Sequence, residues 1–516
     1  MLATALAAAL VGLDLQLVRV EVEISRGVPS FDLVGLAEAA VRESRVRVKS
    51  ALAHVGVDLS EHRTIVNLAP ADFRKAGSGF DLAIAAATLV ALGVAPKDSL
   101  AGTLFVGELS LAGHVHGVRG VLPRLLGARE RGVARAIVPF DNAGEAALLQ
   151  NERITVGAVA TLAELTAVLS GKREARTVSL PVASPRAHAQ DDLADVRGQH
   201  AARRALEIAA AGGHNLLMVG PPGAGKTMLA RRLPGILPPM SLDEAVSVTA
   251  IHSVAGLLAR GESVIAERPF RAPHHTVSDA GLVGGGDGAR PGEVSLAHHG
   301  VLFLDELPEF RRGCLESLRQ PLEDGVVTIS RALAKATYPA RAVVVAAMNP
   351  CPCGFAGDAR CQCGLERVRS YRARLSGPLL DRLDVHVTLP PVQLSSISSG
   401  AAGESSAYVR ARVIAARARQ AERFASGLVG GELNARLTGR DLEVAAPLGG
   451  EGERLLATAA TRLSLSARAY VKVIRVARTI ADLDGDAAVR THHLAEAIAL
   501  RVLDRTAGPP TLEATP

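Results

Sequence analysis

The chain has 516 residues, which is enough for about three domains with separate cores. Hydrophobic residues make up 48% and charged residues 21%, a balance that excludes an intrinsically disordered chain, and with only 3% aromatic residues the cores must depend on Ala, Leu and Val. The net charge of +6 allows a polyanionic partner, and it is equally typical of a mildly basic enzyme.

The first 175 residues alternate short strand patterns with helical patterns. The first ten residues resemble a signal peptide, but they lack a basic segment before the apolar run, so we expect them to begin a folded domain. The predicted strands lie near 15–24, 31–34, 63–68, 103–111 and 135–139, and the predicted helices near 36–55, 80–92 and 121–131.

Nothing in the sequence predicts a membrane or secreted protein. The longest apolar stretch, Leu82 to Ala95, is too short to span a bilayer, and we expect Asp81 to cap its helix. Four of the five cysteines lie between Cys351 and Cys363, which fits a metal site in a reducing compartment better than a disulfide framework. We therefore expect a cytoplasmic protein without a membrane partner.

Two stretches without periodicity divide the chain. Residues 177–192 carry Pro and Ser, and residues 395–406 are rich in Ser and Gly. The central part shows strand patterns at 215–219, 301–304 and 342–347, which predict a parallel sheet, and the last part is helical. The predicted parts are an α+β domain of residues 1–175, a linker of 176–192, a P-loop domain of 193–392, a flexible linker of 393–406, a helical domain of 407–505 and a tail of 506–516.

Residues Gly220 to Thr227 read G-P-P-G-A-G-K-T, between an apolar strand pattern and a helical segment. In this order, glycine-rich backbone N–H groups close around phosphate oxygens and the helix N-terminus adds positive charge. We expect Lys226 to reach the β- and γ-phosphates of ATP and Thr227 to hold Mg²⁺. The predicted nucleotide-binding residues are Gly220, Pro221, Pro222, Gly223, Ala224, Gly225, Lys226, Thr227 and Met228.

A second motif makes the first one specific. Val301 to Glu306 is a buried-strand pattern that ends in two carboxylates, 79 positions after Lys226. We expect Asp305 to bind Mg²⁺ through water and Glu306 to polarise the attacking water. The sequence therefore predicts a protein that binds and hydrolyses ATP.

The cysteine cluster has ligands in the number that tetrahedral zinc prefers. Cys351, Cys353, Cys361 and Cys363 supply four thiolates within thirteen positions, and glycines at 354 and 364 ease the tight turns. The C-x-C spacing is tighter than the usual C-x-x-C knuckle, so a reduced loop without metal is the alternative. The fifth cysteine, Cys314, is predicted on a helix face.

Several long segments resemble the magnesium-chelatase-like AAA+ ATPases of the ComM (YifB) type, and the similarity runs from near residue 10 to near 505. These segments are 198–214, 269–275, 303–310, 348–354, 376–384 and 465–470. The resemblance implies a multidomain α/β chain with an AAA+ core, a helix-2 insert and a helical lid. It also implies a homohexameric ring motor, which in characterised members is a DNA helicase that promotes branch migration during natural transformation.

The same resemblance assigns three further roles. It implies that Asn349 is the sensor of the γ-phosphate, that Arg382 is an arginine finger acting on a neighbouring subunit, and that Arg468 is the second sensor at the start of a lid helix. The alternatives are an ordinary loop asparagine, a surface salt-bridge arginine and simple helix capping.

The long stretch between the two phosphate motifs resembles a helix-2 insert, formed by residues 233–239 and 251–291. We interpret the pairs His274/His275 and His298/His299 as ring-interface or insert-packing residues. Residues 325–340 have hairpin character, and in this family such a hairpin points into the ring pore. Arg331 and Lys335 would then touch DNA phosphates, although solvated basic residues fit the pattern as well.

Segments 75–85 and 106–120 resemble the proteolytic domain of Lon, which needs a serine nucleophile activated by a lysine. Gly79 and Leu122 stand at those two positions, with Ser78 one position early. The resemblance implies a retained Lon-like (ribosomal-protein-like) fold without protease activity, and we expect this domain to assist oligomerisation or DNA handling.

The function that these motifs predict is an ATP-driven ring motor, a DNA helicase or branch-migration factor in the recombination of incoming DNA. Two alternatives remain at this point. One is the ATPase subunit of a magnesium chelatase, and the other is an AAA+ ATPase that remodels or regulates other proteins without a DNA substrate.

Overall fold

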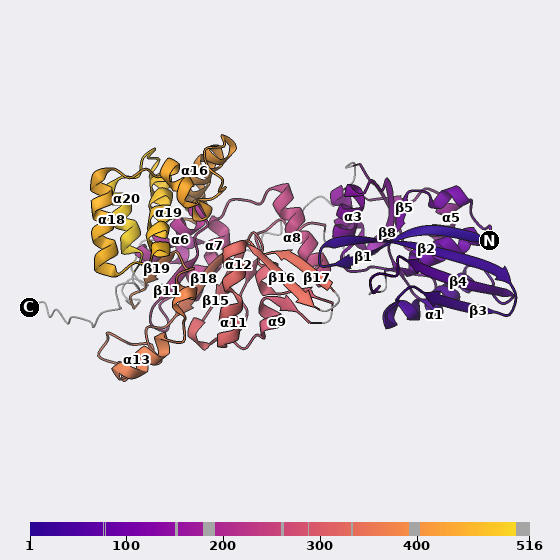
Figure 1. Cartoon of the computed structure of the whole chain (residues 1–516), viewed down its shortest axis with the longest axis horizontal. Coiled ribbons are helices and arrows are strands. Elements are labelled where there is room, and N and C mark those ends of the chain that lie inside the picture. Colours follow the sequence, from indigo (N-terminus) through magenta and orange to yellow (C-terminus); the bar gives the residue numbers. More distant parts are fainter. Residues whose placement is uncertain are drawn as a thin grey trace, which may run out of the picture.

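The computed structural model describes residues 1–75, 77, 79–149, 153–178, 191–259, 263–286, 288–331, 334–391 and 403–501. Most of both predicted linkers and of the tail, with Ser78 and the Arg331 side chain, lies outside these residues. The chain is elongated, with a mixed sheet at the amino-terminal end, a parallel sheet in the middle and helices at the carboxy-terminal end (Figure 1). Within the described ranges, no helix is long and apolar enough to cross a bilayer.

The amino-terminal part is an eight-stranded mixed sheet in the order β10-β9-β8-β5-β1-β2-β4-β3. Its strands are β1 Leu2–Val11, β2 Asp14–Arg26, β3 Ser30–Val34, β4 His62–Ala69, β5 Thr103–Phe105, β8 Arg135–Pro139, β9 Thr155–Val159 and β10 Arg176–Thr177. A short pair, β6 Glu108–Leu109 and β7 Val115–His116, stands apart, and the main helices are α1 Ala39–His54, α2 Asp81–Ala91, α3 Val121–Glu130 and α5 Leu162–Leu169. The strands and helices predicted in this part are therefore confirmed, with the strand near 103–111 divided into two.

Two details of this part differ from the prediction. The alanine-rich start of the chain forms β1, a central strand between β5 and β2, where small side chains fit a sheet that is covered by helices. The expectation that Asp81 caps its helix was wrong, because Phe80 is the N-cap and Asp81 begins α2. The buried Asp81 carboxylate instead accepts hydrogen bonds from Arg47 Nε at 2.6 Å and the Leu109 N–H at 3.0 Å, so a tertiary contact has taken the place of the cap.

The central part is a five-stranded sheet in the order β12-β15-β18-β11-β19, and every pair is parallel. Its strands are β12 Phe270–Arg271, β15 Val301–Leu304, β18 Val343–Met348, β11 Leu216–Val219 and β19 Val385–Thr388. The helices of this part include α6 His200–Gly212, α7 Lys226–Ile236, α8 Leu242–Ala255, α11 Arg312–Ser317, α12 Arg319–Asp324 and α13 Leu365–Arg372. Since all five strands run the same way, the loops after β11, β12, β15 and β18 meet at one edge of the sheet.

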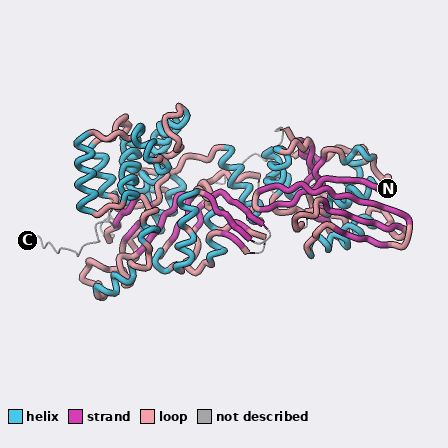
Figure 2. Tube along the Cα trace, viewed as in Figure 1, coloured by secondary structure: helices cyan, strands magenta, loops and turns pink. Residues whose placement is uncertain are grey.

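A two-stranded hairpin projects from the central part, and its prediction is confirmed. β16 Val326–Arg331 pairs antiparallel with β17 Ala334–Pro339. Figure 2 shows strands and helices together in the amino-terminal and central parts, whereas helices make up the carboxy-terminal part.

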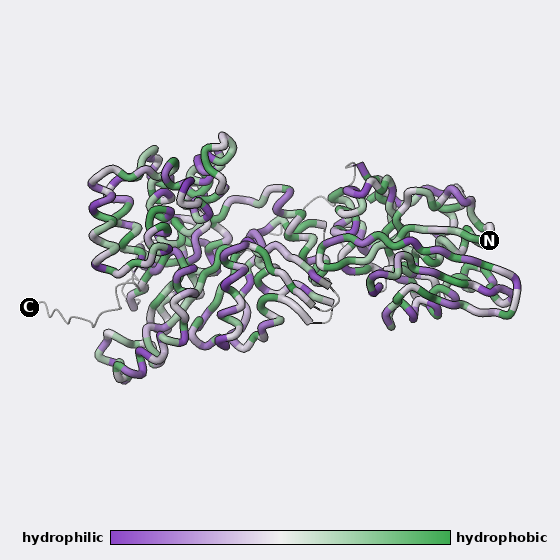
Figure 3. Tube along the Cα trace, in the orientation of Figure 1, coloured by the Kyte–Doolittle hydropathy of each residue, from purple (hydrophilic) through white to green (hydrophobic). Residues whose placement is uncertain are grey.

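The carboxy-terminal helices are α16 Ser406–Ala425, α17 Gly439–Ala445, α18 Gly450–Leu463, α19 Ala467–Asp484 and α20 Thr491–Ala499. Ser466 caps α19, because its Oγ accepts a hydrogen bond from the Ala469 N–H at 3.1 Å. One hydrophobic core joins these helices to the central sheet, with Leu216 and Val385 from strands and Val473 and Ile480 from α19. In Figure 3 the outlying α13 is largely hydrophilic, in contrast to the buried strands.

Candidate nucleotide site

The phosphate loop joins β11 to α7. Gly223 and Gly225 have φ values of 75° and 87°, and a Cβ added at either would meet no described atom within 4 Å. Glycine is therefore required there by the left-handed backbone, not by lack of space. In phosphate loops, this conformation turns successive backbone N–H groups toward the phosphates of a nucleotide.

Lys226 lies at the centre of the site. Its ammonium group donates hydrogen bonds to the carbonyl of Gly220 at 2.7 Å, to the carbonyl of Pro221 at 3.0 Å and to Asn349 Oδ1 at 3.0 Å. Burial lowers the pKa of Lys226, although the carboxylates of Asp305 and Glu306 oppose this effect. The loop carbonyls thus hold a cation at the place where the motif predicts contact with the phosphates.

The two residues predicted to hold Mg²⁺ touch each other. Thr227 Oγ1 donates to Asp305 Oδ2 at 2.8 Å, and Asp305 Oδ1 accepts from the Glu306 N–H at 2.9 Å. A hydroxyl and a carboxylate oxygen in contact are a donor set that suits Mg²⁺. These residues therefore fit the ion, which when bound would offset the negative charge of the phosphates.

Glu306 adjoins a histidine that the sequence did not assign to the site. The distance from His275 Nδ1 to Glu306 Oε2 is 3.3 Å. His275 follows β12, which pairs in parallel with β15, so the residues after both strands share an edge. With two residues, β12 is too short to show a periodic pattern in the sequence. The sequence signal that could have placed His275 at the site was the short apolar segment just before the histidine pair.

The second histidine pair packs inside the central part. His298 Nδ1 accepts from the Arg341 N–H at 3.0 Å, and burial lowers the pKa of His298 to about 3. His299 Nδ1 lies 3.1 Å from Glu244 Oε1 on α8. A packing role thus fits the pair at 298 and 299, whereas His275 faces the nucleotide site.

Asn349 comes directly after β18, the strand beside β11. The Gly220 N–H donates to the Met348 carbonyl at 3.2 Å, which joins the end of β18 to the start of the phosphate loop. Together with the Lys226 contact, this places Asn349 where a sensor of the γ-phosphate would stand.

Arg382 and Arg468 lie together in a different place. Both line a cavity of about 690 Å³, and none of the described residues lining it belongs to the phosphate loop. Arg382 donates to the Arg319 carbonyl at 2.9 Å and the Pro378 carbonyl at 2.7 Å, and it forms an ion pair with Glu323. The two predicted arginine roles therefore share one surface, separate from the nucleotide cradle of the same chain.

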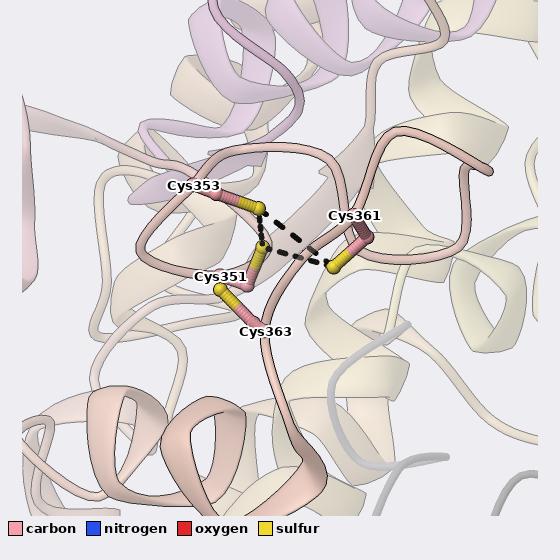
Figure 4. A group of neighbouring side chains, drawn as sticks. All are labelled: Cys351, Cys353, Cys361 and Cys363. Carbon is pink, nitrogen blue, oxygen red and sulfur yellow. Dashed lines mark hydrogen bonds between the residues drawn. The ribbon is translucent and has the colours of Figure 1, made fainter.

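The cysteine loop, residues 351–363, follows Asn349 closely. Figure 4 shows its four cysteine side chains converging on one space, and their sulfur atoms all lie within 4.8 Å of one another. Backbone N–H groups of Phe355 and Gln362 lower the pKa of Cys353 to about 6, which favours its thiolate at neutral pH. At Cys361, a backbone hydrogen bond from Cys363 is outweighed by burial and the neighbouring thiols, which raise the pKa to about 11. The number and convergence of the four sulfurs match the ligand set of a structural zinc ion. Cys314 is separate, buried on α11, as predicted.

Comparison with known proteins covers almost the whole chain. The family described as "Magnesium chelatase, subunit ChlI" matches residues 192–397, and its C-terminal family matches 403–501. The family "Subunit ChlI of Mg-chelatase" matches residues 20–142. YifB of Salmonella typhimurium is 43% identical and the competence protein ComM of Haemophilus influenzae 42% identical, each over 96% of both chains. The chain belongs to the magnesium-chelatase-like ComM/YifB family.

Membership of the ComM/YifB family implies an AAA+ ATPase that uses ATP and Mg²⁺. The phosphate loop, Asp305 and Glu306 described above are the parts of this chain that fit that activity.

Two other predicted regions lie away from the nucleotide. Leu122 is fully buried on α3. A Cβ added at Gly79 would make ordinary contacts at 3.8 Å with Val106 and at 3.9 Å with Arg124 and Val118. On the β16–β17 hairpin, Lys335 is exposed.

Proposed function

We propose that this chain is a cytoplasmic, ATP-driven ring motor that acts on DNA, as a helicase or branch-migration factor in the recombination of incoming DNA. The observation that carries the proposal is the meeting of Lys226, Thr227, Asp305, Glu306 and Asn349 at one sheet edge in a chain of the ComM/YifB family. These side chains supply the groups that ATP cleavage needs.

Each residue has a distinct part in the proposed reaction. Lys226 leaves the loop carbonyls to bind the β- and γ-phosphates, while Thr227 and Asp305 hold Mg²⁺. Glu306 takes a proton from the attacking water, and Asn349 orients that water or the γ-phosphate. Replacement of Glu306 by Gln should keep ATP bound and lower turnover by about 10² to 10⁴-fold.

The position of two arginines supports the proposed ring. Arg382 and Arg468 line one cavity that the phosphate loop of the same chain does not share. In the proposed homohexamer this surface faces the nucleotide of the next subunit, where the arginines stabilise the charge that develops on the transferred phosphoryl group.

DNA is the proposed substrate for two reasons. The relative from Haemophilus influenzae is named a competence protein. The β16–β17 hairpin carries Arg331 and Lys335, which in a pore would neutralise backbone phosphates. The Lon-like amino-terminal domain, with Gly79 and Leu122 in place of a catalytic pair, would assist oligomerisation or DNA handling and would not cleave peptides.

We further propose that Cys351, Cys353, Cys361 and Cys363 hold Zn²⁺. Their four sulfurs converge in one space, and thiolates in this number are a preferred zinc ligand set. Elemental analysis of protein purified without chelator should find zinc, and its clear absence would refute this assignment.

A second candidate is the ATPase subunit of a magnesium chelatase, because the matching families carry that description. ATPase turnover measured with and without single-stranded or branched DNA separates the two. Stimulation by DNA, together with ATP-dependent strand exchange on a three-stranded substrate, supports the helicase. ATPase activity without any response to DNA or retention on DNA supports the chelatase-like or a protein-remodelling role.

A further inference from the structure

The four cysteine sulfurs already have the dimensions of a zinc site. The Sγ–Sγ distances are 3.3 Å for Cys351–Cys353, 3.9 Å for Cys351–Cys361 and 3.7 Å for Cys353–Cys361 (Figure 4). Four ligands about 2.3 Å from a tetrahedral ion are about 3.8 Å apart, whereas disulfide sulfurs are about 2.05 Å apart. The arrangement therefore suits a shared metal ion and not a pair of disulfides.

The first cysteine is rigidly connected to the sensor. Cys351 is fully buried and lies two residues after Asn349, whose Oδ1 accepts a hydrogen bond from Lys226 at 3.0 Å. The intervening Pro350 restricts the backbone between them. Any movement of Cys351 is therefore passed to the side chain that contacts Lys226.

The turn between the cysteine pairs rests on the phosphate loop itself. A Cβ added at Gly354 would lie 2.4 Å from Pro222 Cδ and 2.8 Å from Pro222 Cγ. Gly354 has a φ of 87°, and its N–H donates to the Cys351 carbonyl at 2.9 Å, which closes the turn. The backbone next to Cys353 thus supports one wall of the nucleotide cradle, and only glycine permits this approach.

Little apart from the thiols orders the cysteine loop. Residues 351–363 are all described, contain no helix or strand, and only Cys351 and Gly354 among them are buried. Single turns such as Asp358 N–H to the Phe355 carbonyl hold the rest. A segment with so few apolar contacts opens at low cost in free energy, so a metal ion bound by the four sulfurs would dominate its order.

We propose that zinc in the cysteine loop acts as a clamp that holds Pro222 and Asn349 in position for ATP, so that ATP binding and cleavage depend on zinc occupancy. The inference rests on the proposed ATPase activity and the proposed zinc site. Loss of zinc frees the turn at Gly354 from Pro222 and lets the sensor drift away from Lys226. Misplacement of reacting groups by about 1 Å lowers rates by about a hundredfold.

Two substitutions distinguish zinc binding from the contact between the Gly354 turn and Pro222. Cys363→Ser removes one ligand at a distance from the nucleotide, and it should lower zinc content and raise the KM for ATP, with turnover falling about tenfold to a hundredfold. Gly354→Ala keeps all four thiols and should retain zinc while it weakens ATP binding, because its Cβ collides with Pro222. Gly357→Ala is the matched control, since Gly357 lies in the same loop with a φ of 90° but has no described atom within 4 Å of an added Cβ, and it should retain both properties.

Rescue and reversal complete the test. Cys363→His keeps a zinc ligand and should recover most zinc and ATP affinity. If Cys363→Ser does not fold, extraction of zinc from the wild type with a phenanthroline-type chelator, followed by return of Zn²⁺, gives the same comparison. A folded, zinc-free protein with wild-type KM and turnover would contradict the proposal that ATP binding and cleavage depend on zinc. Wild-type protein that contains no zinc would contradict the zinc site itself. Wild-type protein that neither binds nor cleaves ATP overturns the proposed function instead.

Discussion

Glu306 has a backbone conformation that residues with side chains rarely adopt. Its φ is 51° and its ψ is 46°, in the left-handed region. Such a residue costs about 1–3 kcal/mol, a cost that persists only where the surrounding structure compensates it. His275 Nδ1, 3.3 Å from the carboxylate, adds a second restraint. The backbone at the end of β15 and the contact with His275 after β12 therefore both restrain the Glu306 side chain.

His275→Ala should lower ATP turnover by about tenfold, because in the proposed reaction Glu306 activates the attacking water and would lose the partner that orients its carboxylate. The KM for ATP should stay unchanged, since Lys226 and the glycine loop do not depend on this contact. His275→Asn, which offers an N–H donor near the same place, should recover part of kcat. Steady-state kinetics with wild-type kcat in the His275→Ala protein would contradict the positioning role.

At the scale of elements, one buried ion pair joins the central sheet to the carboxy-terminal helices. Asp384, just before β19, lies 2.6 Å from Lys472 Nζ on α19, and its other oxygen accepts from the Asn215 N–H at 3.0 Å. Burial would raise the pKa of Asp384, but Lys472 and His214 outweigh it and hold that pKa well below its usual range. The ionised carboxylate is therefore part of the contact between α19 and the sheet.

Asp384→Asn should destabilise the protein by about 3–5 kcal/mol at pH 7, because Lys472 is left buried without its partner. The folded-state pKa of Asp384 is lowered, so its contribution is complete above the unfolded value of about 4 and is lost as the pH falls below it. The difference between variant and wild type should accordingly shrink in denaturant titrations at acidic pH. In the double variant Asp384→Asn/Lys472→Met most of the loss at pH 7 should disappear. A single variant as stable as the wild type at pH 7 would disprove the argument.

Elements with their own local signal were predictable from the sequence, and elements defined by neighbours were not. β11 is followed by the glycine loop and β15 by the carboxylate pair, and both strands were predicted. β1 was missed because alanine favours helices in isolation, and only the strands on both sides make it a sheet strand. β12 has two residues and no pattern of its own. The contact of His275 with Glu306 was missed for the same reason, because it forms only when β12 lies beside β15.

At the scale of the whole molecule, the amino-terminal part is fastened to α8 of the central part. Ser253 Oγ donates to the buried Glu145 carboxylate at 2.5 Å, and the Gly120 N–H donates to Ser253 Oγ at 3.0 Å. The β1–β2 turn at Gly12 also packs against Ala336 of the hairpin, where an added Cβ would lie 3.0 Å away. The amino-terminal part therefore contacts both α8 and the hairpin proposed to meet DNA.

Ser253→Ala should loosen this attachment by about 1–3 kcal/mol, because the buried Glu145 carboxylate loses a hydrogen bond. Hydrogen exchange at the Gly120 and Leu122 amides should quicken, since both donate into the same network. Leu242→Ala, at an exposed position of the same helix, serves as the control. Unchanged exchange at Gly120 in the Ser253→Ala protein would show that other contacts fasten the two parts.

The proposed ring makes a prediction that a single chain would not. Lys226→Ala removes the lysine proposed to bind the phosphates, and Arg382→Ala removes the proposed arginine finger. Each variant alone should lose about 10³ to 10⁵-fold in ATP turnover. If Arg382 acts on the nucleotide of the next subunit, rings assembled from both variants contain some subunit interfaces (seams) that are complete. Each complete seam has an intact Lys226 on one subunit and an intact Arg382 on the next. With equal amounts and random assembly, about a quarter of the seams are complete, so activity should return to about a quarter of the wild-type rate.

Arg468→Ala should complement Lys226→Ala in the same way, since it lines the same cavity as Arg382. Mixtures that stay as inactive as their components, despite exchange of subunits seen by fluorescence transfer, would mean that cradle and arginine serve the same chain.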